Sequence, residues 1–176
     1  FGGVDNADSA TSKGAELELT ALVSDNLLVN FNVGYLNAKF DDFVALIEGE
    51  NHRLDGSTIP NSPKWTMSAD AEYGFKFSDA WDGYARLEWV YRDNINPNTR
   101  SLIFTGFPWD VPSYNYFNLR IGAESKNLVL VVYVENLFDK TYAEHLNLAG
   151  NAGFGYPATD PQPVNEPGRT FWTKVD

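Results

Sequence analysis

Cysteine is absent from this chain, and long apolar runs, histidine and positive charge are all scarce. The absence of cysteine excludes a disulfide framework, a thiolate metal site and a cysteine nucleophile. No apolar run approaches the roughly 18 residues of a membrane helix, and the start, Phe1 to Asp5, is not a signal peptide. These absences do not exclude a membrane protein, because β-barrels carry no such run.

Basic residues are few, with 13 Lys and Arg against 24 Asp and Glu and a formal net charge of −11. No basic patch is visible in the sequence, so we expect no nucleic-acid partner. The only histidines, His52 and His145, lie in no zinc-binding or catalytic pattern. Nucleophile-elbow and phosphate-loop patterns are also missing. We therefore predict no catalytic residue, metal site or cofactor, and no enzyme activity.

The chain is rich in aromatic residues, which make up 15% of it, and in a two-residue period. From Trp65 to Phe77, for example, every second residue is apolar and those between are mostly polar. Successive side chains of a strand point to opposite faces, so this pattern predicts strands with one apolar and one polar face. We predict an all-β chain with strands at roughly 14–24, 27–43, 64–77, 83–92, 114–125, 127–138 and 169–175.

The connections between these strands alternate in length. Short breaks at 24–26, 78–82 and 125–126 alternate with long ones at 44–63, 93–113 and 143–168. A transmembrane barrel has short periplasmic turns on one rim and longer extracellular loops on the other. Most of the predicted strands also reach the 9–11 residues, approximately, that cross a bilayer at a tilt. The alternation therefore favours the wall of a membrane barrel.

The two faces of the predicted sheet carry different chemistry. Two aromatic bands are expected at the membrane interfaces, one of Phe75, Phe77, Trp81 and Tyr84 and one of Trp65, Trp89 and Tyr91. Burying an unpaired charge is costly, so the charged face predicts a wide, solvated lumen. That face carries Glu16, Glu18, Asp70, Glu72, Arg86, Glu88, Arg92, Arg120 and Glu124.

A soluble β-sandwich is the alternative. The run from Leu128 to Val134 is apolar on both faces, which is typical of a strand buried on both sides. Seven strands is also an odd count, whereas single-chain bacterial barrels have an even number of at least about eight. The charged face would then simply point to water, and Phe104, Phe107 and Trp109 would stack on sugar in a carbohydrate-binding module.

One motif separates these alternatives. An apolar strand runs into Val134-Glu135-Asn136-Leu137-Phe138-Asp139-Lys140-Thr141-Tyr142, and the last strand opens with Glu166-Pro167-Gly168-Arg169-Thr170-Phe171. In this order, this pair resembles the C-terminal barrel region of TonB-dependent outer-membrane receptors. The segment from Lys13 to Leu19 is similar to a strand opening of these barrels, so the resemblance extends over residues 13–171.

The resemblance implies an antiparallel up-and-down transmembrane β-barrel in the outer membrane of a Gram-negative bacterium. Members of the family have about 22 strands around an N-terminal plug. Seven strands would therefore be a partial barrel, and residues 1–176 would cover roughly its final third. The plug, the earlier strands and the TonB-binding segment are expected to be absent. The ending, Lys174-Val175-Asp176, lacks the usual terminal aromatic residue, so we expect both ends to be truncated.

The resemblance also implies a function, the TonB-dependent uptake of a scarce nutrient. The expected partners are a small molecule (a ferric siderophore, a cobalamin or an oligosaccharide), outer-membrane lipid, and TonB through the missing N-terminal part. Extracellular loops of such receptors contact the ligand, often through aromatic and basic side chains. Our candidates in the long loops are Arg53, Arg100, Phe104, Phe107, Trp109 and His145. The alternative is that the aromatic ones pack against neighbouring loops or lie at the outer rim.

Overall fold

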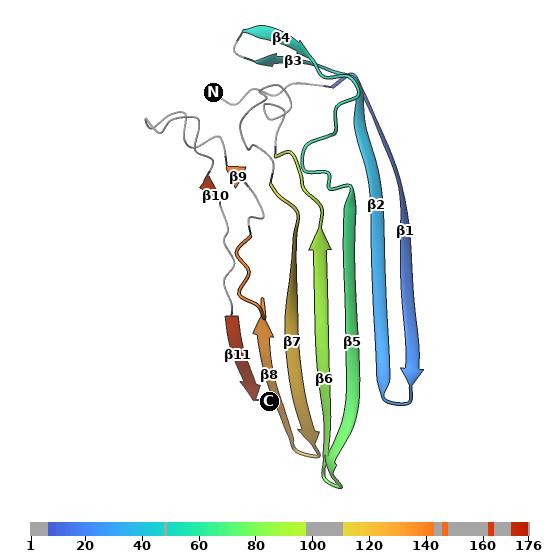
Figure 1. Ribbon diagram of the computed structural model, residues 1–176, viewed down its shortest axis with the longest axis vertical. Coiled ribbons are helices and arrows are strands. Elements are labelled where there is room, and N and C mark those ends of the chain that lie inside the picture. Colours follow the sequence, from blue (N-terminus) through green and yellow to red (C-terminus); the bar gives the residue numbers. More distant parts are fainter. Residues whose placement is uncertain are drawn as a thin grey trace.

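The computed structural model describes residues 7–47, 49–97, 111–142, 146–147, 162–163 and 170–175. Its main element is one antiparallel sheet of seven strands, in which each strand pairs with its neighbours along the chain (Figure 1). The strands are β1 (Ser9–Ser24), β2 (Leu27–Asp42), β5 (Trp65–Ser78), β6 (Trp81–Arg92), β7 (Tyr114–Ser125), β8 (Leu128–Glu135) and β11 (Thr170–Val175). All seven predicted strands are confirmed. None of the described residues belongs to a helix that could cross a membrane.

The connections are sorted between the two ends of the sheet, as predicted. Two-residue turns at 25–26, 79–80 and 126–127 join β1 to β2, β5 to β6 and β7 to β8. All three turns lie at the lower end in Figure 1, and the connection between β2 and β5, with its two small strands, lies at the upper end. This up-and-down order, with one short-turn end and one loop end, is that of a barrel wall.

Two small hairpins lie within the long connections. The first pairs β3 (Val44–Ile47) with β4 (Glu50–Arg53), and the second pairs β9 (Leu146–Asn147) with β10 (Gln162–Pro163). The sequence predicts only long connections, 44–63 and 143–168, where these two pairs of strands lie. The first hairpin forms because Val44, Leu46 and Ile47 meet Glu50 to Arg53 across a turn in which Gly49 has a positive φ of 87°.

The registers give the sheet one apolar and one polar face. Phe31, Ala69, Trp89 and Phe117 are aligned across four strands, and so are Asn30, Asp70, Glu88 and Asn118. Because neighbouring residues in a strand point to opposite faces, the first set marks the apolar face and the second the polar face. In a membrane barrel the apolar face contacts lipid and the polar face lines the lumen.

Buried side chains are concentrated at the loop end. Phe40, Phe43, Ala45 and Leu54 form a small core beneath the β3–β4 hairpin, and Ile59 packs against it. On the apolar face of the wall, by contrast, large side chains are exposed: Leu17, Leu19, Leu87, Ile121 and Val132. Among the described residues no second sheet covers this face. The single up-and-down sheet is the partial barrel wall that the sequence predicts, and its strand order is not that of a sandwich.

Strand β8 differs from the sequence reading in burial and length. Although apolar on both faces, it is not buried on both sides, since Leu130 is 39% exposed and Val132 is 51% exposed. It ends at Glu135 and not at residue 138, because Asn136 takes a positive φ of 50° that turns the chain out of the strand.

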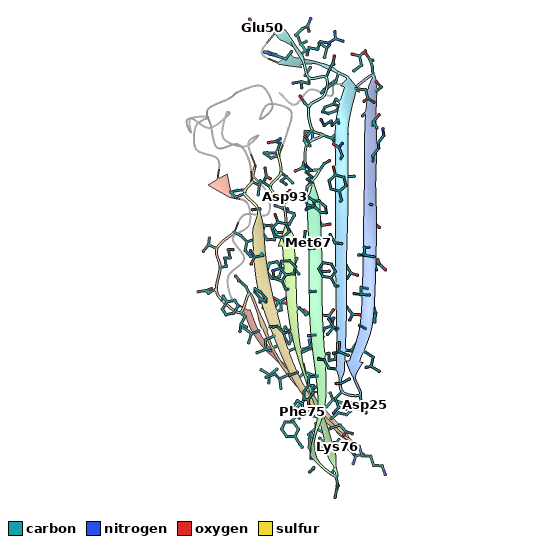
Figure 2. The ribbon with its side chains drawn as sticks, turned by 45° about the vertical axis from the view of Figure 1, so that its right-hand side comes forward. Asp25, Glu50, Met67, Phe75, Lys76 and Asp93 are labelled. Atoms are coloured by element: carbon teal, nitrogen blue, oxygen red, sulfur yellow. The ribbon has the colours of Figure 1, made fainter. Side chains whose placement is uncertain are left out.

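The aromatic bands are present with one correction. Near the short-turn end, the ring centroids of Phe75 and Phe77 lie 4.9 Å apart. Nearer the loops, those of Tyr35 and Trp65 lie 4.8 Å apart. Figure 2 shows Phe75 close to Asp25 and Lys76, at the end opposite Glu50. Tyr84, however, is paired with Gly74 and Gly122 on the polar face. A Cβ at Gly122 would lie 2.1 Å from the Tyr84 ring, so this aromatic residue covers a glycine and does not belong to the lipid-facing band.

Candidate functional site on the polar face of the wall

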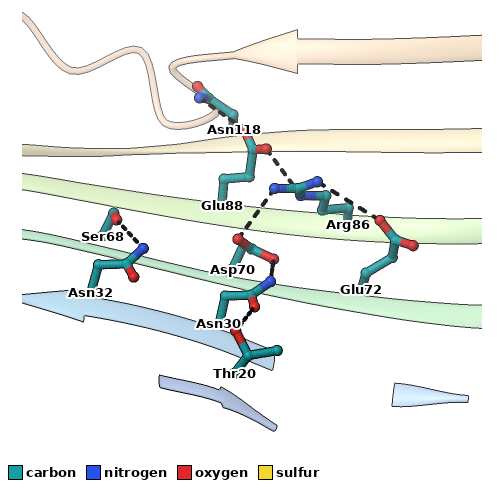
Figure 3. Close-up of polar contacts among 9 residues, drawn as sticks. All are labelled: Thr20, Asn30, Asn32, Ser68, Asp70, Glu72, Arg86, Glu88 and Asn118. Carbon is teal, nitrogen blue, oxygen red and sulfur yellow. Dashed lines mark hydrogen bonds and ion pairs between the residues drawn. The ribbon is translucent and has the colours of Figure 1, made fainter. Parts of the chain in front are cut away.

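A chain of polar contacts, which we call the polar ladder, crosses the polar face from β1 to β7 (Figure 3). Thr20 donates to Asn30 at 2.8 Å, and the Asn30 amide donates to Asp70 at 3.0 Å. Arg86 donates to the other Asp70 oxygen at 3.2 Å, and Asn118 donates to Glu88 at 3.5 Å. Every strand from β1 to β7 in the wall therefore contributes one or two polar side chains at nearly the same height.

Arg86 is the centre of the polar ladder. Its guanidinium lies 3.2 Å from Asp70, 3.1 Å from Glu88 and 3.9 Å from Glu72. The Nε–H is not aimed at the near Glu88 oxygen, so that contact is an ion pair without hydrogen-bond geometry. Three carboxylates face this guanidinium, and Arg120 is its partner in the β6–β7 register, so both signs of charge meet on this part of the polar face. This is consistent with a solvated lumen wall.

The polar ladder continues into the Asn-Leu-Phe-Asp-Lys motif. The backbone N–H of Asn136 donates to the Asn118 side chain at 3.0 Å, and Leu137 N–H donates to the Phe117 carbonyl at 2.7 Å. The Asn136 side chain in turn accepts from Lys140 N–H at 3.0 Å and donates to the Lys140 carbonyl at 2.9 Å. Only 3% of Asn136 is exposed. The motif is thus a structural turn that ends β8 and redirects the chain.

The chain after this turn builds an aromatic cluster that the sequence reading missed. Tyr142 stacks on Tyr114 and Tyr116, with ring centroids 4.4 and 5.3 Å away, and the Arg92 guanidinium lies 4.6 Å from the Tyr114 centroid. We call these four residues the tyrosine cluster. Tyr114, Tyr116 and Arg92 share the polar face because Arg92 pairs with Tyr114 in the β6–β7 register. A sequence signal did exist, namely aromatic residues spaced by two at the start of β7.

The tyrosine cluster borders a shallow hollow in the polar face. The hollow measures about 430 Å³, and its polar-face lining includes Glu16, Glu18, Asn32, Ser68, Arg92 and Tyr114. Asn32 donates to Ser68 at 3.2 Å on its floor. Glycine at position 34 keeps the floor low, because a Cβ there would lie 2.8 Å from the Thr66 hydroxyl. The hollow combines the Tyr114 ring, the Arg92 guanidinium, the two carboxylates of Glu16 and Glu18, and neutral hydrogen-bonding groups.

Of the predicted ligand contacts, only Arg53 lies in the described part of the chain. It pairs with Asp42 at 3.4 Å and with Asp55, and Asp55 also accepts from the Phe43 backbone N–H at 3.1 Å. The Phe43 amide, followed by Arg53, lowers the pKa of Asp55, and Asp55 raises the pKa of Arg53. Arg53 therefore anchors the β3–β4 hairpin. Arg100, Phe104, Phe107, Trp109 and His145 lie outside the described residues.

No cluster of three or more His, Cys, Asp or Glu side chains suited to a metal ion occurs among the described residues. The carboxylates of the polar ladder surround Arg86 and are spread along two strands, with no group converging on one point. The described part of the polar face thus presents charged groups, hydrogen-bonding groups and the rings of the tyrosine cluster.

Comparison with known proteins agrees with this geometry. A family model described as TonB dependent receptor-like, beta-barrel matches residues 2–137. A search of curated protein sequences found no match. Similar solved structures include the siderophore receptor PiuA from Acinetobacter baumannii, with a TM-score of 0.65 and 21% identity over 94% of this chain. The ferric yersiniabactin uptake receptor FyuA from Yersinia pestis gives 0.63 and 14% over 95%.

The copper transporter OprC gives a TM-score of 0.62 and 29% identity over 94% of this chain. This chain spans only 21%, 22% and 23% of the lengths of PiuA, FyuA and OprC respectively. The family model covers most of the sequence, and the matched residues include the six strands from β1 to β8 of the wall and its three short turns. The chain therefore belongs to the TonB-dependent receptor-like β-barrel family.

Proposed function

We propose that this chain is the C-terminal part of the barrel of an outer-membrane receptor that takes up a scarce nutrient, such as a ferric siderophore, with energy supplied through TonB. Members of the family are receptors and transporters, and not enzymes. PiuA and FyuA are named as siderophore receptors, which supports this nutrient class, and OprC is named as a copper transporter. The plug, the TonB-binding segment and the earlier strands would belong to parts of the receptor beyond this sequence.

The observation that carries this proposal is the difference between the faces of a single sheet. The apolar face leaves Leu17, Leu87 and Val132 more than two-fifths exposed, whereas the opposite face carries the polar ladder and the tyrosine cluster. Exposed apolar surface of this extent is stable only in contact with lipid or another protein. A wall that is apolar outside and charged inside suits a large barrel with a solvated interior.

The tyrosine cluster and the hollow beside it form our proposed ligand surface on the wall. A guanidinium and stacked phenol rings bind anionic and aromatic groups through charge-assisted hydrogen bonds and ring contacts. The long loops would add Arg100, Phe104, Phe107, Trp109 and His145, with Arg53 holding the first hairpin in place. The cluster lies at the loop end, so a ligand entering from outside would meet it early.

The test is uptake by the intact receptor that carries this chain. It would be expressed in a strain without other siderophore receptors, and radiolabelled iron supplied on catecholate, hydroxamate or mixed siderophores would be counted, with radiolabelled copper alongside. We expect accumulation of one ligand class that disappears in a tonB-deficient strain. The variant R92A/Y114A should lose uptake, whereas K76Q, on the polar face near the short turns, should keep it. Uptake of none of these probes, or equal uptake without TonB, would refute the proposal.

A further inference from the structure

Along β2, the apolar residues switch from one face of the strand to the other partway along its length. From Val29 to Tyr35 the odd-numbered residues belong to the apolar face. Beyond Tyr35 the even-numbered residues are the apolar ones, and Ala38 and Phe40 are 5% and 9% exposed, whereas Asn37 and Lys39 are exposed. The β1–β2 register continues without a shift through this region, up to Phe40. The strand is therefore regular, and only its surroundings change.

This reversal locates a boundary. Below it the outward face is apolar, as lipid requires, and above it the outward face is polar and the inward face packs on the loop-end core. The Tyr35–Trp65 pair lies at the change. At about 3.3 Å per residue and a tilt of about 40°, the stretch from Trp65 to Phe75 rises roughly 25 Å, which is the height of an apolar barrel band. Tyr35 and Trp65 thus lie at the outer headgroup level.

Three lysines lie on the outward side just above this boundary, and we call them the lysine band. Lys13 of β1 pairs with Asn37, and Lys39 of β2 pairs with Thr11, so the two lysines are diagonal neighbours on one face. Lys64 precedes β5, and its carbonyl accepts from Leu36 N–H at 3.0 Å. Its Nζ lies 5.9 Å from the Tyr35 ring centroid. The sequence separates these residues, and the sheet brings them together.

The lysine band differs from Arg53 and Arg86 in its ion pairing. Arg53 and Arg86 are each paired with two or three carboxylates. In the described part of the chain, no carboxylate forms an ion pair with Lys13, Lys39 or Lys64. The nearest acid on the same face of β2, Asp41, accepts a hydrogen bond from Thr11. Neighbouring like charges repel each other, so an anionic partner would stabilise the lysine band.

We propose that the lysine band binds the phosphate groups of the glycolipid that forms the outer leaflet around the barrel. This rests on the proposed location of the receptor in the outer membrane. The band faces away from the lumen, at headgroup height, so a lipid anion fits it and a transported ligand does not. Lysines at this level attract anionic headgroups, and an ammonium on an aromatic ring is typical of interfacial anchors.

The test compares the intact receptor with the variant K13Q/K39Q/K64Q, its three single variants, and the control K76Q/K126Q at the short-turn end. The probe is bisphosphorylated lipid A, titrated into purified receptor and counted by native mass spectrometry. We expect affinity to fall on the order of 100-fold in the triple variant and about fivefold in each single variant. The control should bind bisphosphorylated lipid A with the affinity of the wild type. Dephosphorylated lipid A should bind the wild type as weakly as bisphosphorylated lipid A binds the triple variant.

The inference is overturned if the triple variant stays within about twofold of the wild type, which is below the expected effect of even one lysine. The single variants keep the test decisive if the triple variant fails to assemble. Membrane fractionation and heat-modifiable electrophoretic mobility check the proposed location separately. A receptor absent from the outer membrane would refute the proposed function and the lipid site together. A correctly inserted receptor whose lipid A binding ignores the lysines would refute the lipid site alone.

Discussion

The barrel wall and the loop-end core are two different solutions to burying apolar residues in one chain. The core of Phe40, Phe43, Ala45 and Leu54 is small and closed, and its members are at most 9% exposed. On the apolar face of the wall, leucines such as Leu17 are up to 58% exposed, because the apolar environment lies outside the protein. The same residue types therefore contribute to stability by internal packing at the loop end and by contact with lipid along the wall.

Charge placed on the lipid side of the wall gives the sharpest test of this difference. Leu87 and Leu119 are cross-strand partners on the apolar face. Replacing both with Arg should cost roughly 4–8 kcal/mol, since one arginine near the bilayer midplane costs about 2–4 kcal/mol. We expect loss of the heat-modifiable form in outer-membrane assembly assays.

The matched control replaces the neighbouring polar-face pair, Glu88 and Asn118, with Gln and Asp respectively, which exchanges charge within the lumen. This variant should assemble nearly as well as the wild type. Equal failure of the two variants would mean that the faces are assigned the wrong way round.

Truncation within the loop-end core should act locally. Leu54 is 5% exposed and its N–H donates to the Phe43 carbonyl at 2.8 Å. Leu54→Ala should destabilise the hairpin by about 2–4 kcal/mol through lost contacts and a cavity. Protease cleavage within 44–57 on intact cells should increase, while the barrel remains heat-modifiable. Loss of the folded barrel in this variant would show that core and wall are one cooperative unit.

The turn at Asn136 should be sensitive to both backbone and side chain. Alanine tolerates the φ of 50° at position 136 less well than asparagine does. Asn136→Ala also removes both side-chain hydrogen bonds to Lys140. We expect a loss of about 2–3 kcal/mol in urea unfolding of the folded barrel. Asn136→Gly removes the same bonds but permits the φ, so it should lose roughly 1 kcal/mol less. A glycine variant as unstable as the alanine variant would show that backbone strain contributes nothing.

Much of the wall could be predicted from the sequence because each strand carries its own period. The alternation from Trp65 to Phe77 needs no knowledge of neighbours to define two faces. The expected band groups Tyr84 with Phe75 by height along the strand, whereas the alternation of β6 puts Tyr84 on the same face as Arg86 and Glu88. The doubly apolar β8 was misread because burial depends on what covers a strand and not on its composition.

The tyrosine cluster and the lysine band could not be predicted in the same way. Tyr142 reaches Tyr114, which Arg92 also contacts, only because the chain turns at Asn136. Lys13 and Lys39 become neighbours only through the β1–β2 register. Such sites join residues that are distant in sequence, so no local pattern announces them. No run of basic residues marks the lysine band, because its members lie in β1, in β2 and just before β5.

The smallest effect concerns pH and again separates the hairpin from the wall. The Phe43 amide and then Arg53 lower the pKa of Asp55, so its folded value lies below the unfolded value of about 3.9. The carboxylate therefore stabilises hairpin docking fully above that unfolded value, and the contribution is lost as pH falls through the folded value. Hydrogen exchange of the Phe43 amide, normalised for intrinsic rate, should accelerate below about pH 4.

In Asp55→Asn the Phe43 amide should be less protected at neutral pH and should show no such transition, while β6 and β7 amides stay protected in both proteins. An unchanged acid transition in the Asn variant would assign it to another carboxylate, and Asp42, the second partner of Arg53, would be the next to replace.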